Sequence, residues 1–370
     1  MQKEIIIVVS AMNLGGAQRV VSILCDHWSQ RGFKVTLIST FTGKTIQHYN
    51  VSPDIKLLSL KNSPLFKNNK LINLIWKLKQ LRKIFKEENP DYIISFLTRV
   101  NVASALSTIG LKTPVIISER TWTPFAKLSK RFFWFYRILF KHIDKIIVQT
   151  EKSKLWLSNY FPGLNSFVIP NPVLYPLPNN EFKSEHPDSI LSKQRKVILA
   201  SGRLHAFKQF DLLISSFSRL QDQFCDWDLV ILGDGEEKKN LETLITNLNA
   251  HDRIFLAGSV SNIADWYQRA DLFVLSSLVE GFPNVLLEAM TYGLPCISFD
   301  CDTGPSDMIE HGYNGFLVNP IEKENGLVNA LKLVMSNEEI RKKFSNNSIL
   351  LREKYSSANI MKQWDDILGL

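Results

Sequence analysis

Cysteine is scarce in this chain and is not arranged in pairs. The 370-residue sequence has four cysteines (Cys25, Cys225, Cys296 and Cys301), and none of them forms a CxxC motif or lies beside a histidine cluster. A disulfide framework and a cysteine–histidine zinc site are therefore not expected. Each cysteine is interpreted as a small buried hydrophobic residue, and a reducing cytoplasm is the expected compartment.

Long apolar runs are also missing. No stretch approaches the roughly 18 to 20 apolar residues that a membrane-spanning helix needs. The N-terminus, MQKEIIIVVS, places an acid before a short apolar run and lacks a small-residue cleavage site. We therefore expect a first strand there instead of a signal peptide. A hydrophobic content of 45% and a mean hydropathy of −0.04 are typical of a globular protein.

Acidic residues are few in the first half of the chain. Residues 1–180 hold 25 Lys and Arg against 9 Asp and Glu, a net charge of +16, whereas residues 181–370 hold 19 against 27, a net charge of −8. The segments 71–86 and 127–145 combine basic residues with apolar or aromatic ones. Such amphipathic helices suit an anionic membrane surface without crossing it. We expect a peripheral protein on the inner face of the cell membrane; the alternative is two core-facing helices whose cations face water.

Short apolar runs alternate with helical patterns along the whole chain. The runs are residues 5–10, 34–39, 55–60, 91–96, 114–118 and 144–150, and then 196–202, 227–233, 253–258, 271–277, 294–300 and 315–318. This alternation predicts an α/β protein with two Rossmann-like, doubly wound parallel sheets that face each other across a cleft. The expected domains are residues 1–170 and 196–355, joined by a linker at 171–195, with a terminal helix at 356–370 that packs back toward the first domain. Ligands of such sheets bind beyond the carboxyl ends of the strands.

Two glycine-containing motifs follow predicted strands. In SAMNLGGAQRV (10–20), Gly15 and Gly16 allow backbone N–H groups to approach an anion at a helix N-terminus. In ASGRLHAFKQFD (200–211), Gly202 allows close approach, Arg203 offers a planar fork of donors and Lys208 a mobile charge, which together suit a diphosphate. The alternatives are a tight strand-to-helix turn and a solvated basic loop, respectively. Neither motif has the GxGxxG spacing of a dinucleotide site.

A pair of glutamates brackets a turn in EGFPNVLLEAMTYGLPCISFD (280–300). Glu280 precedes a Gly-Phe-Pro turn, and Glu288 shares a polar stripe with Asn284 and Thr291 on the predicted helix 284–292. A carboxylate can accept hydrogen bonds from two neighbouring hydroxyl groups of a sugar. Helix capping is the alternative, but a capping box requires a spacing of three, and Glu288 follows Asn284 by four.

Together these motifs resemble the family 4 retaining glycosyltransferases of the GT-B fold. The resemblance covers nearly the whole chain and includes IPNPV (169–173) and GPSDMIEHGYNGFLV (304–318). It implies a nucleotide-sugar donor and no metal or other cofactor. It also implies that Arg203 and Lys208 hold the diphosphate, that Glu280 contacts the donor hexose, and that Glu288 binds the ribose; Arg203, Lys208 and Glu280 would form the catalytic set. The other implied donor contacts are Gly15, Gly16, Gly202, Arg253, Phe255, Phe282, Pro283, Asn284 and Val285.

One pair of residues departs from the family pattern. Glu119 and Arg120 stand where many relatives carry Glu-His. An arginine is not a base at neutral pH, but it can hold a phosphate. The two residues are therefore predicted to contact the acceptor or the donor sugar, and the alternative for Arg120 is a surface arginine after a strand.

The resemblance implies transfer of a hexose or N-acetylhexosamine from a UDP-sugar to a lipid-linked, polyprenyl diphosphate saccharide, with retention, in the assembly of bacterial surface polysaccharides such as lipopolysaccharide or O-antigen. A GDP-mannose-dependent enzyme is the alternative within the family, and an epimerase or a glycogen-type phosphorylase shares the fold. From other classes, a basic nucleic-acid-binding protein and a non-catalytic membrane scaffold remain open. Nucleic acid is not the expected partner.

Overall fold

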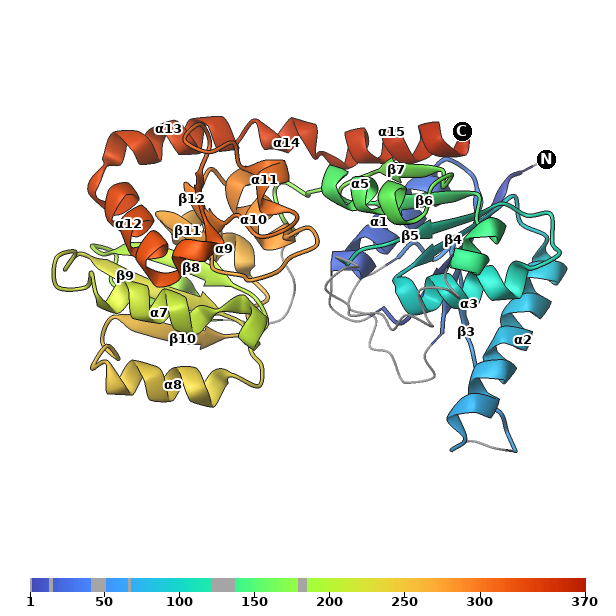
Figure 1. The fold of residues 1–370 in the computed structure, drawn as a ribbon, viewed down its shortest axis with the longest axis horizontal. Coiled ribbons are helices and arrows are strands. Elements are labelled where there is room, and N and C mark those ends of the chain that lie inside the picture. Colours follow the sequence, from blue (N-terminus) through green and yellow to red (C-terminus); the bar gives the residue numbers. More distant parts are fainter. Residues whose placement is uncertain (1, 13–15, 41–50, 66–67, 122–136, 179–184) are drawn as a thin grey trace. The chain divides into compact units, whose positions relative to one another are not determined.

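The chain forms two compact units, each built on one parallel β-sheet (Figure 1). This computed structural model describes residues 2–12, 16–40, 51–65, 68–121, 137–178 and 185–370. The N-terminal unit comprises Met1–Pro172 together with Ile360–Leu370, and the C-terminal unit comprises Val173–Asn359. Each unit is described separately below.

The sheet of the N-terminal unit has seven strands in the order β3-β2-β1-β4-β5-β6-β7. Its strands are β1 (Glu4–Val9), β2 (Lys34–Ser39), β3 (Lys56–Ser59), β4 (Tyr92–Phe96), β5 (Val115–Ser118), β6 (Lys145–Val148) and β7 (Ser166–Val168). All neighbours are parallel, as the β1–β2 register from Glu4↔Lys34 to Val9↔Ser39 illustrates. Ile5 to Val9 are fully buried because helices cover both faces of the sheet.

Helices connect these strands. They are α1 (Gly16–Gln30), α2 (Lys70–Glu88), α3 (Thr98–Thr108), η2 (Phe140–His142) and α5 (Glu151–Tyr160). The α2 helix begins where the Asn69 side chain accepts hydrogen bonds from the N–H groups of Leu71 and Ile72, and it ends at Asn89 in the left-handed region. Figure 1 shows the first turns of α2 extending beyond the sheet of this unit.

The last helix, α15 (Ser357–Leu368), returns the chain to the N-terminal unit. Trp364 is fully buried and meets Trp28 of α1 edge-to-face, with ring centroids 6.4 Å apart. Asp365 accepts a hydrogen bond from Trp28 Nε1 at 3.0 Å and lies 2.9 Å from His27 Nε2. These contacts anchor the C-terminus to α1.

The sheet of the C-terminal unit has six strands in the order β10-β9-β8-β11-β12-β13, and all neighbours are parallel. The strands are β8 (Lys196–Ser201), β9 (Trp227–Leu232), β10 (Ile254–Gly258), β11 (Leu272–Leu275), β12 (Cys296–Phe299) and β13 (Phe316–Val318). The helices are α6 (Pro187–Ile190), η3 (Ala206–Lys208), α7 (Phe210–Ser218), α8 (Lys238–Asn247), α9 (Ile263–Arg269), α10 (Asn284–Thr291), α11 (Pro305–Met308), η4 (Pro320–Glu322), α12 (Lys323–Ser336), α13 (Glu338–Ser348) and α14 (Leu351–Lys354). One continuous apolar core joins the sheet to α7, α8 and α12.

The structure confirms the twelve predicted strands with small shifts at their ends, and it adds β7. β7 (Ser166–Val168) has three residues, one of them the polar Ser166, so its apolar run is only two residues long. The expectation of four buried cysteines is wrong for Cys225, which is exposed in the turn before β9, while the other three are buried. Within the described residues, no helix combines the length and apolar character needed to span a bilayer.

Candidate functional site

Two loops of the C-terminal unit meet at the point where its strand order reverses. The chain runs from β8 outward through β9 and β10, and then returns to place β11 on the other side of β8. The loops that follow β8 and β11 therefore flank the switch point, where ligands of open α/β sheets bind. Two hydrogen bonds join the loops: Leu278 N–H donates to Phe207 O at 2.8 Å, and Ser276 Oγ donates to Lys208 O at 2.7 Å.

An ion pair bridges the same two loops. Lys208 Nζ lies 2.5 Å from Glu280 Oε1, and Ser277 Oγ donates to this same oxygen at 2.6 Å. The side chains of Lys208 and Glu280 are 23% and 12% exposed. An ammonium group has three donors and a carboxylate has two oxygens. In the part of the chain that the structure describes, two donors of Lys208 and Oε2 of Glu280 have no hydrogen-bond partner.

Glycine at position 202 leaves space for this lysine. A Cβ atom on Gly202 would lie 3.3 Å from Lys208 Cε and 3.6 Å from Cδ. The next strand's loop packs on the same backbone, because a Cβ on Gly233 would lie 1.9 Å from Gly202 O. Gly202 is thus closely packed by Lys208 and by the loop after β9, and Gly233 is a second glycine requirement that sequence reasoning missed.

The second predicted cation of this loop lies at the surface. Arg203 is 73% exposed, and its Nη2 lies 3.2 Å from Glu236 Oε2 after β9. His205 Nε2 lies 3.3 Å from the other oxygen of Glu236. Exposed pairs of this kind contribute little to stability, so the Arg203 guanidinium can change partners at low cost.

The turn between Glu280 and α10 is held by a segment that sequence reasoning did not assign to the site. Thr303 Oγ1 donates to Glu280 O at 2.5 Å. Gly304 has φ 98° and packs so closely that a Cβ would lie 2.5 Å from Pro283 Cδ. Phe282 is buried, and its ring centroid lies 5.8 Å from that of Tyr355. The turn is thus rigidly placed at the start of α10.

The second glutamate lies on α10 and is buried. Tyr267 of α9 donates through its hydroxyl to Glu288 Oε2 at 3.1 Å and contacts Val285 O at 3.3 Å. Glu288 is 5% exposed, and Thr291 on the same stripe is fully buried. The structure therefore brings Glu280, Asn284, Val285 and Glu288 onto one turn-and-helix element, with Tyr267 as a partner that no sequence motif revealed.

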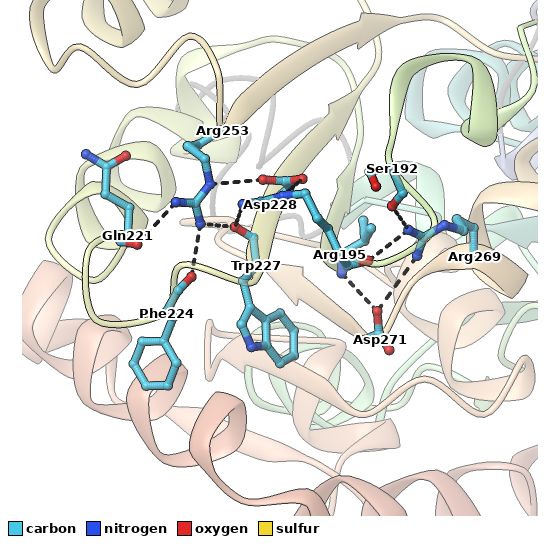
Figure 2. A network of polar contacts seen from close by, with 10 residues as sticks. Ser192, Arg195, Gln221, Phe224, Trp227, Asp228, Arg253, Arg269 and Asp271 are labelled. Carbon is cyan, nitrogen blue, oxygen red and sulfur yellow. Dashed lines mark hydrogen bonds and ion pairs between the residues drawn. The ribbon is translucent and has the colours of Figure 1, made fainter.

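Arg253, whose polar contacts Figure 2 shows, lies at the opposite edge of the sheet from these residues. It precedes the first residue of β10, whereas Lys208 and Glu280 follow carboxyl ends of strands. Its Nε donates to Asp228 Oδ1 at 3.0 Å, and its remaining nitrogens bond the carbonyl groups of Gln221, Phe224 and Trp227. The structure does not bring the Arg253 side chain to the predicted donor residues. Phe255 is half-buried on β10, the edge strand.

Three predicted residues of the N-terminal unit are described. Gly16 is the first residue of α1, directly beyond β1; Gly15 falls outside the described residues. Glu119 and Arg120 follow β5 and are both buried, which rules out the surface interpretation of Arg120. Glu119 accepts hydrogen bonds from Thr98 Oγ1 and Asn101 Nδ2, both at 2.8 Å.

The chemistry of the C-terminal site favours a ligand that carries both negative charge and hydroxyl groups. Two cations on one loop can hold anionic oxygens, and the glutamates can accept hydroxyl hydrogen bonds. Cys301 lies near Glu280, but burial, aided by the charge of Glu280, raises the pKa of its thiol to about 12. The thiol is thus protonated and poorly nucleophilic at neutral pH. Among the described residues, no three His, Cys, Asp or Glu side chains are grouped as metal ligands.

Two doubly wound units, one of them with a polar site at the switch point of its sheet, define a two-domain α/β protein. The comparisons with known proteins identify the family. The model "Glycosyltransferase Family 4" matches residues 14–173, and the model "Glycosyl transferases group 1" matches residues 181–350. The chain belongs to this glycosyltransferase family, and the GT-B fold expected from the sequence is confirmed.

Two relatives and one solved structure match this chain over most of their length. An uncharacterized glycosyltransferase of Methanocaldococcus jannaschii is 31% identical, over 81% of this chain and 86% of its own. The GalNAc-alpha-(1->4)-GalNAc-alpha-(1->3)-diNAcBac-PP-undecaprenol alpha-1,4-N-acetyl-D-galactosaminyltransferase of Campylobacter jejuni is 27% identical, over 98% of this chain and 97% of its own. The structure of Anabaena HepE in complex with UDP covers 100% of both chains with a TM-score of 0.80 and 19% identity. This last likeness shows the fold.

Proposed function

We propose that the protein transfers a hexose or N-acetylhexosamine from a UDP-sugar to a lipid-linked saccharide, with retention of the anomeric configuration and without a metal. The observation that carries the proposal is the bridge between Lys208 and Glu280 at the switch point of the C-terminal sheet. Its unsatisfied donors and acceptor match the two chemical parts of a nucleotide sugar, a diphosphate and a hydroxyl-bearing ring. A relative that acts on an undecaprenyl diphosphate saccharide supports the acceptor class.

Each residue of the site has a role in this reaction. The bond between the sugar and the β-phosphate breaks, and negative charge develops on the departing diphosphate. Lys208 and Arg203 stabilise that charge, because preformed donors favour the transition state over the ground state. Glu280 accepts hydrogen bonds from hydroxyl groups of the transferred sugar through Oε2. Glu288 orients the ribose from α10, and the departing phosphate accepts the proton of the attacking hydroxyl group.

We also propose that α2 of the N-terminal unit contacts an anionic membrane surface, where a lipid-linked acceptor resides. The first turns of α2 expose large apolar side chains, namely Leu71 at 66%, Leu74 at 52%, Ile75 at 47% and Trp76 at 40%. Lys70 and Lys79 on these turns are exposed as well. Apolar side chains next to cations favour binding to anionic headgroups. Replacing Leu71 and Ile75 by Asp should abolish co-sedimentation with vesicles that contain phosphatidylglycerol; unchanged sedimentation would contradict this surface.

A thermal-shift panel tests the donor site. The wild-type protein is mixed with UDP-, GDP- and ADP-sugars, and the unfolding midpoint and the slow hydrolysis of each donor are recorded. We expect stabilisation by UDP-sugars that is lost in Glu280→Ala and Arg203→Ala. Arg219→Ala is a matched control, because Arg219 Nη1 forms a surface pair with Glu324 Oε1 at 3.2 Å, as Arg203 does with Glu236, but at the far end of α7.

The outcomes separate the proposals. Stabilisation by GDP-sugars alone would assign the alternative donor within the family. Absence of any shift with nucleotide sugars would refute the function proposed here. Equal losses of ligand-induced stabilisation in Arg219→Ala and Arg203→Ala would show that the loss in Arg203→Ala does not arise from the donor site.

A further inference from the structure

A buried arginine that forms no ion pair with any described residue follows a strand of the N-terminal sheet. Arg120 follows β5 and is 8% exposed. Its guanidinium carbon lies 5.2 Å from the ring centroid of Phe96 and 5.8 Å from that of Trp364. One nitrogen, Nη1, donates to Asn171 Oδ1 at 2.7 Å. Buried arginines are ordinarily paired with an acid.

The two other nitrogens of this guanidinium, Nε and Nη2, are buried and have no hydrogen-bond partner in the described part of the chain. The neighbouring acid does not compensate them, because Glu119 uses its oxygens on Thr98 and Asn101. Burial lowers the pKa of the Arg120 guanidinium to about 9, which reflects the loss of hydration without a compensating charge. The arginine is still charged at neutral pH.

The unsatisfied atoms form one edge of the guanidinium plane. Nε–H and one Nη–H point the same way and make the parallel pair of bonds by which arginine binds carboxylate or phosphate. The bond from Nη1 to Asn171 fixes the plane and leaves this buried edge without a hydrogen-bond partner among the described residues. The two aromatic rings attract the charge, but ring faces supply no acceptor in the plane of the donors. A ligand with two anionic oxygens would satisfy both donors.

The backbone around this arginine is strained as well. Leu97, directly after β4, has φ 76° and ψ 139°, a region that non-glycine residues rarely occupy. Its neighbours are Phe96, beside Arg120, and Thr98, which bonds Glu119. Leu97 N–H donates to Ser118 O at 3.1 Å, which holds the strained turn against the end of β5. Strain of this kind gathers at ligand sites, where it sets the position of polar groups.

We propose that the Nε–Nη2 edge of Arg120 is a preformed site for two oxygens of a substrate phosphate group. The inference rests on the proposed function, because both substrates of that reaction carry a diphosphate. The phosphate belongs to the nucleotide sugar or to the lipid-linked acceptor. The same bidentate chemistry serves either source, and the experiment below distinguishes them.

The test uses Arg120→Met, which keeps the length of the side chain but removes the charge and the donors, and Arg120→Lys, which keeps the charge but removes the fork. Arg99→Met is the matched control, because it removes an exposed cation from the first turn of the adjacent α3 helix. Inorganic pyrophosphate, UDP and farnesyl diphosphate are titrated into each protein, and the thermal midpoint is recorded without ligand.

We expect the affinity for pyrophosphate to fall about tenfold or more in Arg120→Met, with partial recovery in Arg120→Lys and no change in Arg99→Met. A parallel loss for UDP assigns the site to the donor, and a parallel loss for farnesyl diphosphate assigns it to the lipid-linked acceptor. Without ligand, Arg120→Met should unfold no earlier than the wild type, because it removes an uncompensated buried charge.

Two results would overturn the site. One is equal affinity of the wild type and both Arg120 variants for all three probes. The other is a lowered unfolding midpoint of Arg120→Met with unchanged affinities, which would show a structural role only. If Arg120→Met does not fold, the affinities of Arg120→Lys for the same three probes, compared with those of the wild type, decide between these outcomes. The proposed function is tested apart from this site. If the Arg120 variants lose farnesyl diphosphate binding while the wild type binds no UDP, the phosphate site at Arg120 stands and the proposed UDP-sugar donor is refuted.

Discussion

The pair formed by Lys208 and Glu280 allows a quantitative test of the site through stability. The two side chains are 23% and 12% exposed, with Nζ and Oε1 2.5 Å apart. Breaking a fully buried pair by removing one partner costs about 3–5 kcal/mol, and a fully exposed pair contributes about 0–1 kcal/mol. This pair lies between those limits, so Lys208→Met and Glu280→Gln should each lower the free energy of unfolding by about 1–3 kcal/mol.

The double variant separates the interaction from the loss of each side chain. Because both singles remove the same interaction between opposite charges, Lys208→Met/Glu280→Gln should cost less than the sum of the singles, with a coupling energy of about 1–2 kcal/mol. Ser277 Oγ still donates to the amide oxygen in Glu280→Gln, which keeps the loop in place. Urea unfolding of the four proteins at pH 7 measures the cycle.

Additive losses would refute this reasoning, since they would mean that the two charges do not interact across the loops. A coupling energy of opposite sign would do the same. A cycle of Arg219→Ala and Glu324→Ala serves as the control for an exposed pair, and there we expect a coupling of about 0–1 kcal/mol.

Further predictions concern the sheet, the donor site and pH. Asp228→Asn should lower the free energy of unfolding by about 3 kcal/mol, because it leaves Arg195 and Arg253 (Figure 2) without their buried acid, while the affinity for UDP should stay within about twofold. Tyr267→Phe should cost about 1–2 kcal/mol in urea unfolding by removing the bond to a buried carboxylate; an unchanged midpoint would contradict that bond. Lys56 and Lys34 hold the pKa of Glu88 at about 2, below its ordinary value of 4.5, so Glu88 stabilises the fold above pH 4.5 and this contribution is lost as the pH falls toward 2. The stability difference between wild type and Glu88→Gln should therefore shrink over that range, and a constant difference would contradict the linkage.

The family resemblance groups Lys208 and Glu280 in one catalytic set, and the structure brings them together for a physical reason. Parallel strands bring their carboxyl ends to one edge of the sheet, and the two residues follow adjacent strands, β8 and β11. The same rule places Arg253 away from them, because it precedes its strand.

Other contacts could not be predicted from local patterns. The bonds of Thr303 and Tyr267 to the 280–288 element join segments about 20 residues apart, and their geometry depends on how loops close. The burial of Arg120 depends on Trp364, which is brought to β4 and β5 only when α15 returns to the N-terminal unit. Contacts of such long range leave no periodic signal in the sequence.

The most direct test of the central claim is the affinity of UDP for Lys208→Met, measured by isothermal titration calorimetry beside the wild type and Arg219→Met. If the loops after β8 and β11 hold the diphosphate, loss of a charge-assisted hydrogen bond should weaken binding about 10- to 100-fold in Lys208→Met, with Arg219→Met unchanged. Wild-type affinity in Lys208→Met would contradict the account.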